Sequence, residues 1–379
     1  MEQRRSLELL FTTRICEGVP QTQSANCCFS SIVRLPTGEL LISWRVGSQK
    51  DSADGAIWMS RSVDGTSWTA PQEIIRAGIR DGVLGEPHYG PLTVLADGRI
   101  LCAVMWVDRS DSDRPFFSPK TEGLLPLQTL FLESHDLGNT WREIGRLDDA
   151  PYGAPLAITG SVLELADGAW ACPFEVNKNY DDAGPWRHAA ALKFSYDAGR
   201  SWPECVEIAN DPSGRRMYWD ARVMSAADGH YRATFWTFDR VDHVDRTIHW
   251  AESHDAGRTW SAPRDLGVVG QVAEFVELGD GRWLLVYVDR YQTRSIRAML
   301  SAVDGSKIGE EIVVYQHPAG KSEIGEGAAT TDYLQDMELW TFGRIQTVAD
   351  ARGSVWVVYY AGDSRSTGIY CARLGQSSS

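Results

Sequence analysis

The chain has 379 residues, which exceeds the usual limit for a single hydrophobic core, so it must form either several domains or an array of repeated units. Its formal net charge of -14 disfavours nucleic acid as a partner, because a phosphate-binding surface carries a basic excess. No stretch is apolar for long enough to span a bilayer, and no apolar signal segment follows Met1, so we expect a cytoplasmic protein without membrane contact.

The composition favours strands over helices. The 35 Gly and 15 Trp suit many short strands that are joined by tight turns. The seven cysteines are scattered without metal-ligand spacing, and neighbours such as Cys27 and Cys28 are poorly placed for a disulfide, so we expect buried thiols and a reducing compartment. No phosphate-cradling glycine loop or dinucleotide fingerprint is present, and we therefore predict no cofactor and no metal.

In chain order, the first recurring element is a hairpin. An apolar run, a two-residue turn that ends in Gly, and a second apolar run first appear over residues 32–44. The same turn returns five times, at Asp97-Gly98, Asp167-Gly168, Asp228-Gly229, Asp280-Gly281 and Arg352-Gly353. Each repeat predicts the first two strands of one unit.

A second recurring element follows the first four hairpins. It is the pattern Ser-x-Asp-x-Gly-x-Ser/Thr-Trp, found at Ser134–Trp141, Ser195–Trp202 and Ser253–Trp260, with a shortened copy at Ser62–Trp68 and a decayed one at Ser301–Gly305. Asp and Ser side chains can bond the backbone of their own turn, and Trp can pack beneath it. The spacing leaves room for a third strand before each pattern and a fourth after it.

This pattern resembles the Asp-box of the sialidase (neuraminidase) superfamily of BNR repeat proteins. The resemblance and the spacing predict an all-β fold, a six-bladed β-propeller of four-stranded antiparallel blades that forms one domain over residues 1–379. The blades are expected near 28–75, 88–146, 159–208, 219–266, 271–315 and 343–375. The unassigned run at 6–12 should complete the last blade and close the ring, because an open edge strand is a liability.

This arrangement sorts the loops by face. The hairpin turns and the Asp-boxes lie on one side, and the longer polar loops lie on the other, where binding is expected. The adjacent Ser134, His135 and Asp136 cannot form a catalytic triad and belong to a turn. Residues just before each first strand should ring the channel mouth, among them Trp219, Gln271 and Glu274. The most suggestive are His88, Tyr89, Asp220, Arg222 and Arg344.

The loop 45–55 resembles the loop that carries the acid/base Asp of sialidases. Alignment places Asp51 on that residue, with Asp54 as the second choice, and Arg45 at the start of the loop as a substrate ligand. Asp220 and Glu274 could supply a second carboxylate, and Glu86 or Glu175 could lie close enough.

The chain also departs from the sialidase pattern. Cys28-Phe29-Ser30 stands where those enzymes have Arg-Ile-Pro, and Phe342-Gly343-Arg344 stands where they have the Tyr nucleophile, with Tyr333 nearby but out of register. Only Arg222 and Arg344 are plausible counterparts of the three arginines that bind the sialic acid carboxylate.

Three functions remain open, all with a carbohydrate as partner. The first is a glycoside hydrolase that uses Asp51. The second is a polysaccharide lyase in which His88 or Tyr89 is the base and Arg222 and Arg344 neutralise a uronate. The third is a glycan-binding propeller without catalysis. The sequence leaves the sugar, the linkage, the stereochemistry and the oligomeric state undetermined.

Overall fold

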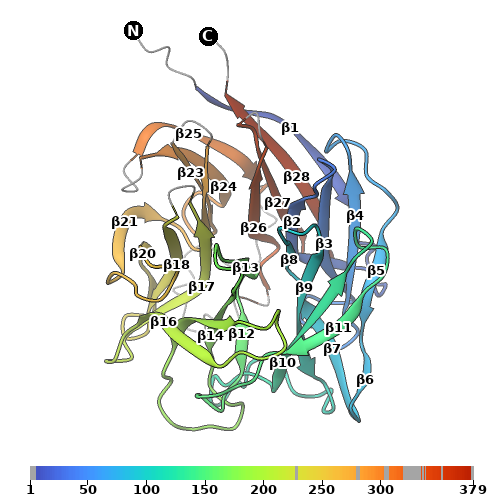
Figure 1. The fold of residues 1–379 in the computed structure, drawn as a ribbon, viewed down its shortest axis with the longest axis vertical. Coiled ribbons are helices and arrows are strands. Elements are labelled where there is room, and N and C mark those ends of the chain that lie inside the picture. The colour runs from blue at the N-terminus through green and yellow to red at the C-terminus, as the bar shows by residue number, and fades with distance from the viewer. Residues whose placement is uncertain are drawn as a thin grey trace.

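The computed structural model describes residues 6–226, 229–278, 282–302, 307–318, 334, 337, 339–350 and 353–376. The fold is all-β, and its strands form antiparallel sets that are each built on four strands, with short extra strands in places; the fourth strand of the last set comes from the N-terminus. In Figure 1 these sets follow one another in sequence order around the centre of the molecule. Asp228, Asp280-Gly281, Arg352, Tyr333 and most of the decayed Asp-box lie outside the described residues.

The strands of the first three sets are as follows. The first set is β2 (Asn26–Arg34), β3 (Leu40–Gly47), β4 (Ala56–Ser62) and β5 (Gln72–Arg76). The second is β7 (Val83–Tyr89) with β8 (Leu92–Val94), then β9 (Ile100–Asp108), β10 (Leu127–Ser134) and β11 (Arg142–Arg146), with β6 (Gly78–Arg80) paired to β7. The third is β12 (Leu156–Ile158) with β13 (Leu163–Glu164), then β14 (Trp170–Val176), β15 (Ala189–Ser195) and β16 (Glu204–Asn210).

The remaining sets repeat this order. The fourth is β17 (Arg216–Ser225), β18 (Tyr231–Asp239), β20 (Thr247–Ser253) and β21 (Arg264–Val269), with β19 (Val244–Asp245) paired to β18. The fifth is β22 (Ala273–Glu277), β23 (Trp283–Asp289), β24 (Ser295–Ser301) and β25 (Lys307–Gln316). The last is β26 (Phe342–Ala349), β27 (Val355–Asp363), β28 (Ser366–Gln376) and β1 (Leu7–Cys16).

The N-terminal strand pairs with the last strand of the chain, as the sequence predicted. β1 runs antiparallel to β28, from Leu7 opposite Gln376 to Cys16 opposite Ile369. The first and last strands, β1 and β28, therefore lie at the same edge of the molecule (Figure 1). A single bridge between Asn26 and Thr367 joins this set to the first one. The pairing covers an edge of β28 that would otherwise be open.

The Asp-boxes form the predicted turns between third and fourth strands. In the box after β10, the Ser134 hydroxyl accepts a hydrogen bond from Gly138 N at 2.7 Å, and Asp136 accepts one from Thr140 N at 2.8 Å. Trp141 Nε1 then donates to the Gly138 carbonyl at 3.0 Å. Because the carboxylate and hydroxyl satisfy the backbone of their own turn, the Asp-box has a structural role.

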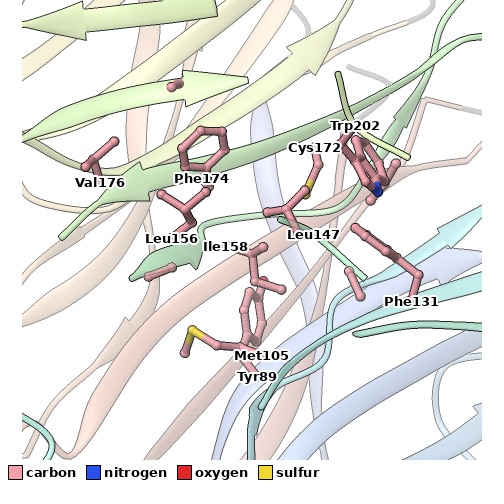
Figure 2. Close-up of a cluster of buried hydrophobic side chains, with 14 of the residues drawn as sticks. Tyr89, Met105, Phe131, Leu147, Leu156, Ile158, Cys172, Phe174, Val176 and Trp202 are labelled. Carbon is pink, nitrogen blue, oxygen red and sulfur yellow. The ribbon is translucent and has the colours of Figure 1, made fainter. Parts of the chain in front are cut away.

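The box tryptophans also tie neighbouring sets together. Trp202, from the box after β15, is 1% exposed and stacks on Phe131 of β10 with a centroid distance of 4.6 Å. Figure 2 shows this pair at one end of a buried cluster that includes Leu156 and Phe174. The core therefore lies between the faces of adjacent sheets, as expected for stacked layers.

Candidate active site

A cavity of about 120 Å³ lies on the side of the molecule that carries the longer loops. Aromatic rings make up much of its wall, among them Phe29, Phe116, Phe117, Trp219, Trp236 and Trp340. Three carboxylates from different sets of strands, those of Asp51, Glu175 and Asp220, also line it. Among the described residues, none of the Asp-boxes contributes to this wall, as the sorting of loops by face predicted. Aromatic rings with a few polar groups are typical of small-molecule sites.

Bulges in the first strands turn several side chains toward this cavity. We expected the candidates to precede these strands, but β2, β7, β17 and β26 begin earlier than the apolar runs suggested and contain them. The pairing of each of these strands with the second strand of its set shifts register close to the candidate residues. Phe29, Asp220 and Arg344 have φ values of 51°, 49° and 40° there, and all three line the cavity. A non-glycine residue at positive φ is strained, and such strain concentrates at functional sites.

Asp51 is part of a buried chain of charges. Its Oδ1 lies 3.4 Å from Nε2 of His88, whose Nδ1 lies 2.8 Å from Oε1 of Glu86. The side chains of Asp51, His88 and Glu86 are 17%, 4% and 0% exposed. The His88 ring stacks on Phe116 with a centroid distance of 4.3 Å, which fixes its plane. Asp51 is therefore the exposed end of this chain and faces the cavity.

The charges around Asp51 keep it ionised. Burial opposes ionisation, but the interaction with His88 and the charge of Lys50 outweigh burial and hold the pKa of Asp51 well below its ordinary value. Burial likewise opposes ionisation of Glu86, yet the charges of Arg45 and His88 lower its pKa to about 2. Asp54, the second choice for the catalytic residue, instead accepts hydrogen bonds from Ser48 N and the Ser52 hydroxyl within its own loop.

Arg45 lies behind the cavity wall. It is fully buried on β3, and its guanidinium contacts Glu86 and the carbonyls of Gln49 and Ser52. The prediction that it binds substrate therefore does not match its position, because Arg45 is buried and does not line the cavity. Its nitrogens are engaged by protein oxygens.

A second cluster surrounds Asp220. Its Oδ1 lies 3.1 Å from Nη2 of Arg222 and 3.5 Å from Nη1 of Arg344. Arg222 Nη1 donates to the Tyr89 hydroxyl at 3.5 Å, and the Arg344 guanidinium lies 3.9 Å from the centre of the Tyr89 ring. The structure thus brings together four of the predicted residues, although Arg222 stands behind the wall that Tyr89, Asp220 and Arg344 form.

Glu274 also lies behind this cluster. Its Oε1 is 3.7 Å from Arg222 Nη1, and its Oε2 accepts hydrogen bonds from Thr347 N and the Thr347 hydroxyl at 2.8 and 3.1 Å. Burial raises the pKa of Glu274 to about 7, and the charge of Arg222 offsets this only in part. Glu274 is therefore close to the cavity but does not form its wall.

The last two predicted ligands take different positions. Trp219 lines the cavity and stacks on His188 with a centroid distance of 5.5 Å. Gln271 stands behind the wall, where its amide donates to Asp245 at 3.0 Å and its carbonyl accepts from Arg290. Arg290 does line the cavity, 3.9 Å from the centre of the Trp340 ring. Gln271 thus supports a cavity residue.

Sequence reasoning missed several residues of the wall, of which Lys50, Phe116, Arg290 and Trp340 are the most prominent. Three of them lie in loops that follow second strands, which the sequence had marked as binding loops without choosing these residues. Glu175, weighed as a nearby carboxylate, lines the cavity at the end of β14, 3.6 Å from His188. Within the described ranges, no group of three or more His, Cys, Asp or Glu could hold a metal ion.

Comparisons with known proteins identify the family. Residues 38–318 match the family model of the BNR repeat-like domain. The chain therefore belongs to this family, within the sialidase-like superfamily that the Asp-boxes indicated. No curated protein matches the chain in sequence. In the described part of the chain, no helix is long and apolar enough to cross a membrane.

Solved structures share the fold at low sequence identity. A Dyadobacter fermentans protein of unknown function has a TM-score of 0.74 at 20% identity, covering 98% of this chain and 100% of that one. A Penicillium chrysogenum alpha-L-arabinanase, solved with arabinobiose, has a TM-score of 0.64 at 14% identity, covering 96% and 98%. A Trypanosoma rangeli sialidase has a TM-score of 0.63 at 13% identity, covering 98% and 60%.

Proposed function

We propose that the chain is a glycoside hydrolase built on a single six-bladed β-propeller, and that it acts on an uncharged glycan or small glycoside in the cavity. Contacts between sets of strands support the ring, because β2 contacts both β8 and β26, and β22 contacts both β17 and β26. The pairing of β1 with β28 supplies the fourth strand of the last blade. The scattered free thiols support a cytoplasmic location.

The observation that carries the proposal is the set of three carboxylates on one aromatic-walled cavity. Glycosidases in general need two carboxyl groups that flank the scissile bond. Asp51 is ionised in this environment, so it serves as base or nucleophile. Asp220 is held between two arginines, whereas Glu175 pairs with His188, so Glu175 is the better candidate for the acid.

The charges of the wall support an uncharged substrate. Arg344 contacts Asp220, and Arg290 donates to Gln271 and to the Phe342 carbonyl. The third cation, Lys50, donates to the Met337 carbonyl. Since these three cations are already bound by protein oxygens, a carboxylated sugar would have to displace existing contacts. A neutral sugar can instead stack on the rings, with its hydroxyls toward the carboxylates.

Replacement of Asp51 tests the proposal. With a panel of aryl glycosides that includes neutral pentosides, hexosides and sialosides, we expect Asp51→Asn to lower kcat by about 100- to 10,000-fold. Binding of a neutral disaccharide, measured by calorimetry, should survive. Asp113→Asn, the same change in an exposed loop on the same side, should keep full activity. Full activity of Asp51→Asn would remove the assignment.

One contact favours a second function, β-elimination from a uronate-containing glycan. The Tyr89 hydroxyl lies next to Arg222, with Arg344 over the ring, as a base beside a cationic site requires. Digestion of uronate polymers would then give products that absorb in the near ultraviolet. Products without this absorbance would exclude the lyase, and binding without turnover of any substrate would leave a glycan-binding propeller.

A further inference from the structure

Glu86 is a fully buried carboxylate that does not line the cavity, yet it contacts His88, Arg45 and Arg109, which hold Asp51 or its loop. We propose that Glu86 is a positioning residue, which orients the Asp51 carboxylate through His88 and fixes the Asp51 loop through two arginines. This inference rests on the proposed catalytic role of Asp51. It concerns a residue on β7, in a different set of strands from the loop that it positions.

The first route runs through the His88 ring. A carboxylate only accepts hydrogen bonds, so the contact of 2.8 Å between Glu86 Oε1 and His88 Nδ1 places a proton on Nδ1. The opposite nitrogen, Nε2, faces the ionised Asp51 at 3.4 Å. The ring therefore lies between the two carboxylates and orients the Asp51 carboxylate. Stacking on Phe116 prevents the ring from rotating away.

The second route runs through the backbone of the loop. Arg45 contacts Glu86 Oε2 with Nε at 3.2 Å, and its other nitrogens donate to the carbonyls of Gln49 and Ser52 at 3.0 and 2.6 Å. Arg109 Nη2 lies 3.1 Å from Glu86 Oε1 and donates to the Asp51 carbonyl at 2.8 Å. Both arginines therefore bind Glu86 and the loop at once, Arg45 on either side of Asp51 and Arg109 at Asp51 itself.

Close packing of the loop against Glu86 is an independent sign of this role. A Cβ atom at Gly55 would lie 2.2 Å from Glu86 Oε2 and 3.0 Å from Arg45 Nη2. Neither atom can move aside easily, because both are buried and engaged. The loop thus ends on a glycine where its backbone passes directly over the carboxylate.

The test compares Glu86→Gln with Glu133→Gln, a matched control. Glu133 on β10 is also buried and also binds two arginines and a histidine, but it contacts none of the described cavity residues. We expect Glu86→Gln to lower kcat by about 10- to 100-fold with little change in KM, as for other residues that orient a catalytic group. Glu133→Gln should keep the wild-type kcat.

The pH dependence separates positioning from a general loss of structure. The charged or titratable groups around Asp51 and His88 are Glu86, Arg45, Lys50, Arg109 and Cys28. Without Glu86 to hold the ring, His88 no longer stays against Asp51, and the pKa of Asp51 rises toward its ordinary value because the interaction with His88 is the main influence that lowers it. The acidic limb of the pH–rate profile should then move to higher pH, and Glu133→Gln should leave it in place.

A measurement without substrate completes the test. The Nδ1–H proton signal of His88, assigned by its loss in His88→Gln, should move upfield in Glu86→Gln but keep its wild-type position in Glu133→Gln, because Glu86 is the carboxylate that this proton contacts. This shift would support the contact network even if no glycoside were cleaved, in which case only the proposed function fails. An unchanged His88 Nδ1–H signal, or a Glu86→Gln variant with wild-type kcat and pH profile, would overturn the inference.

Discussion

The second set of strands carries two buried glutamates, each of which binds two arginines and one histidine. Glu86 on β7 binds Arg45, Arg109 and His88. Glu133 on β10 binds Arg99, Arg142 and His135. In both cases burial opposes ionisation, but the charged partners lower the pKa of the carboxyl group to about 2.

The two networks differ in their surroundings. The partners of Glu86 are all buried and come from two sets of strands, so the network joins β7 to the Asp51 loop. By contrast, the side chains of Arg142 and His135 are 70% and 58% exposed, and every partner of Glu133 belongs to its own set. Solvent screens charges at the surface, whereas buried charges depend on one another. Identical residue types can therefore hold a loop at the cavity in one place and lie at the surface in another.

Among variants that compare the two networks, Gly55→Ala, next to Glu86, is expected to have the largest effect on kcat. The new methyl group would collide with Glu86 Oε2 at 2.2 Å and push the Asp51 loop out of place, so kcat should fall by about 100-fold. Gly78→Ala, where a Cβ would meet nothing within 4 Å, should leave kcat unchanged. Steady-state kinetics of both variants measure the difference. Normal activity of Gly55→Ala would show that the loop does not depend on this close approach.

A smaller effect is expected for Glu274→Gln. Glu274 is a buried carboxylate whose pKa is raised, whereas the pKa values of Glu86 and Glu133 are lowered. Burial raises the pKa of Glu274 to about 7, because one arginine at 3.7 Å does not offset it. A carboxyl group whose folded pKa is raised stabilises the fold fully below its unfolded pKa and loses that contribution as pH rises to 7. Each tenfold change in the ionisation equilibrium between the folded and unfolded states corresponds to about 1.4 kcal/mol.

Thermal unfolding from pH 4.5 to 8 measures this contribution. The wild type should lose stability over this range, and Glu274→Gln should lose less, because glutamine cannot ionise. Asp245, whose pKa is raised to about 6 by burial, will contribute a residual slope in both proteins. Parallel curves for the two proteins would contradict the assignment.

The smallest effect is expected for Asp197→Ala in the Asp-box after β15. Asp197 accepts hydrogen bonds from the backbone and hydroxyl of Ser201 at 2.8 and 2.6 Å. Since this turn lies away from the cavity, we expect Tm to fall by about 2 °C while kcat stays the same. A loss of activity at unchanged Tm would mean that the Asp-box side also takes part in function.

The repeats made much of the fold predictable. Hairpin turns and Asp-boxes set the order of strands, and the free run at the N-terminus matched the missing strand of the last set, because a turn is encoded locally by Asp, Ser and Gly. The bulges at Phe29, Asp220 and Arg344 were not predictable, since they depend on packing around the cavity. Asp51, His88 and Tyr89 were predicted at the cavity because of their place in a loop or strand. Lys50 and Arg290 were missed because their position at the wall depends on packing.

The pattern Glu-x-His separates what the sequence determines from what the tertiary structure decides. It occurs as Glu86-Pro87-His88, Glu133-Ser134-His135 and Glu252-Ser253-His254, and in a strand this spacing places both side chains on one face. The sequence alone determined that proximity, and contacts of 2.8, 2.7 and 4.0 Å are observed. Only the tertiary structure decided that the first pair is buried against the Asp51 loop, because burial and the choice of partners depend on residues that are distant in the chain.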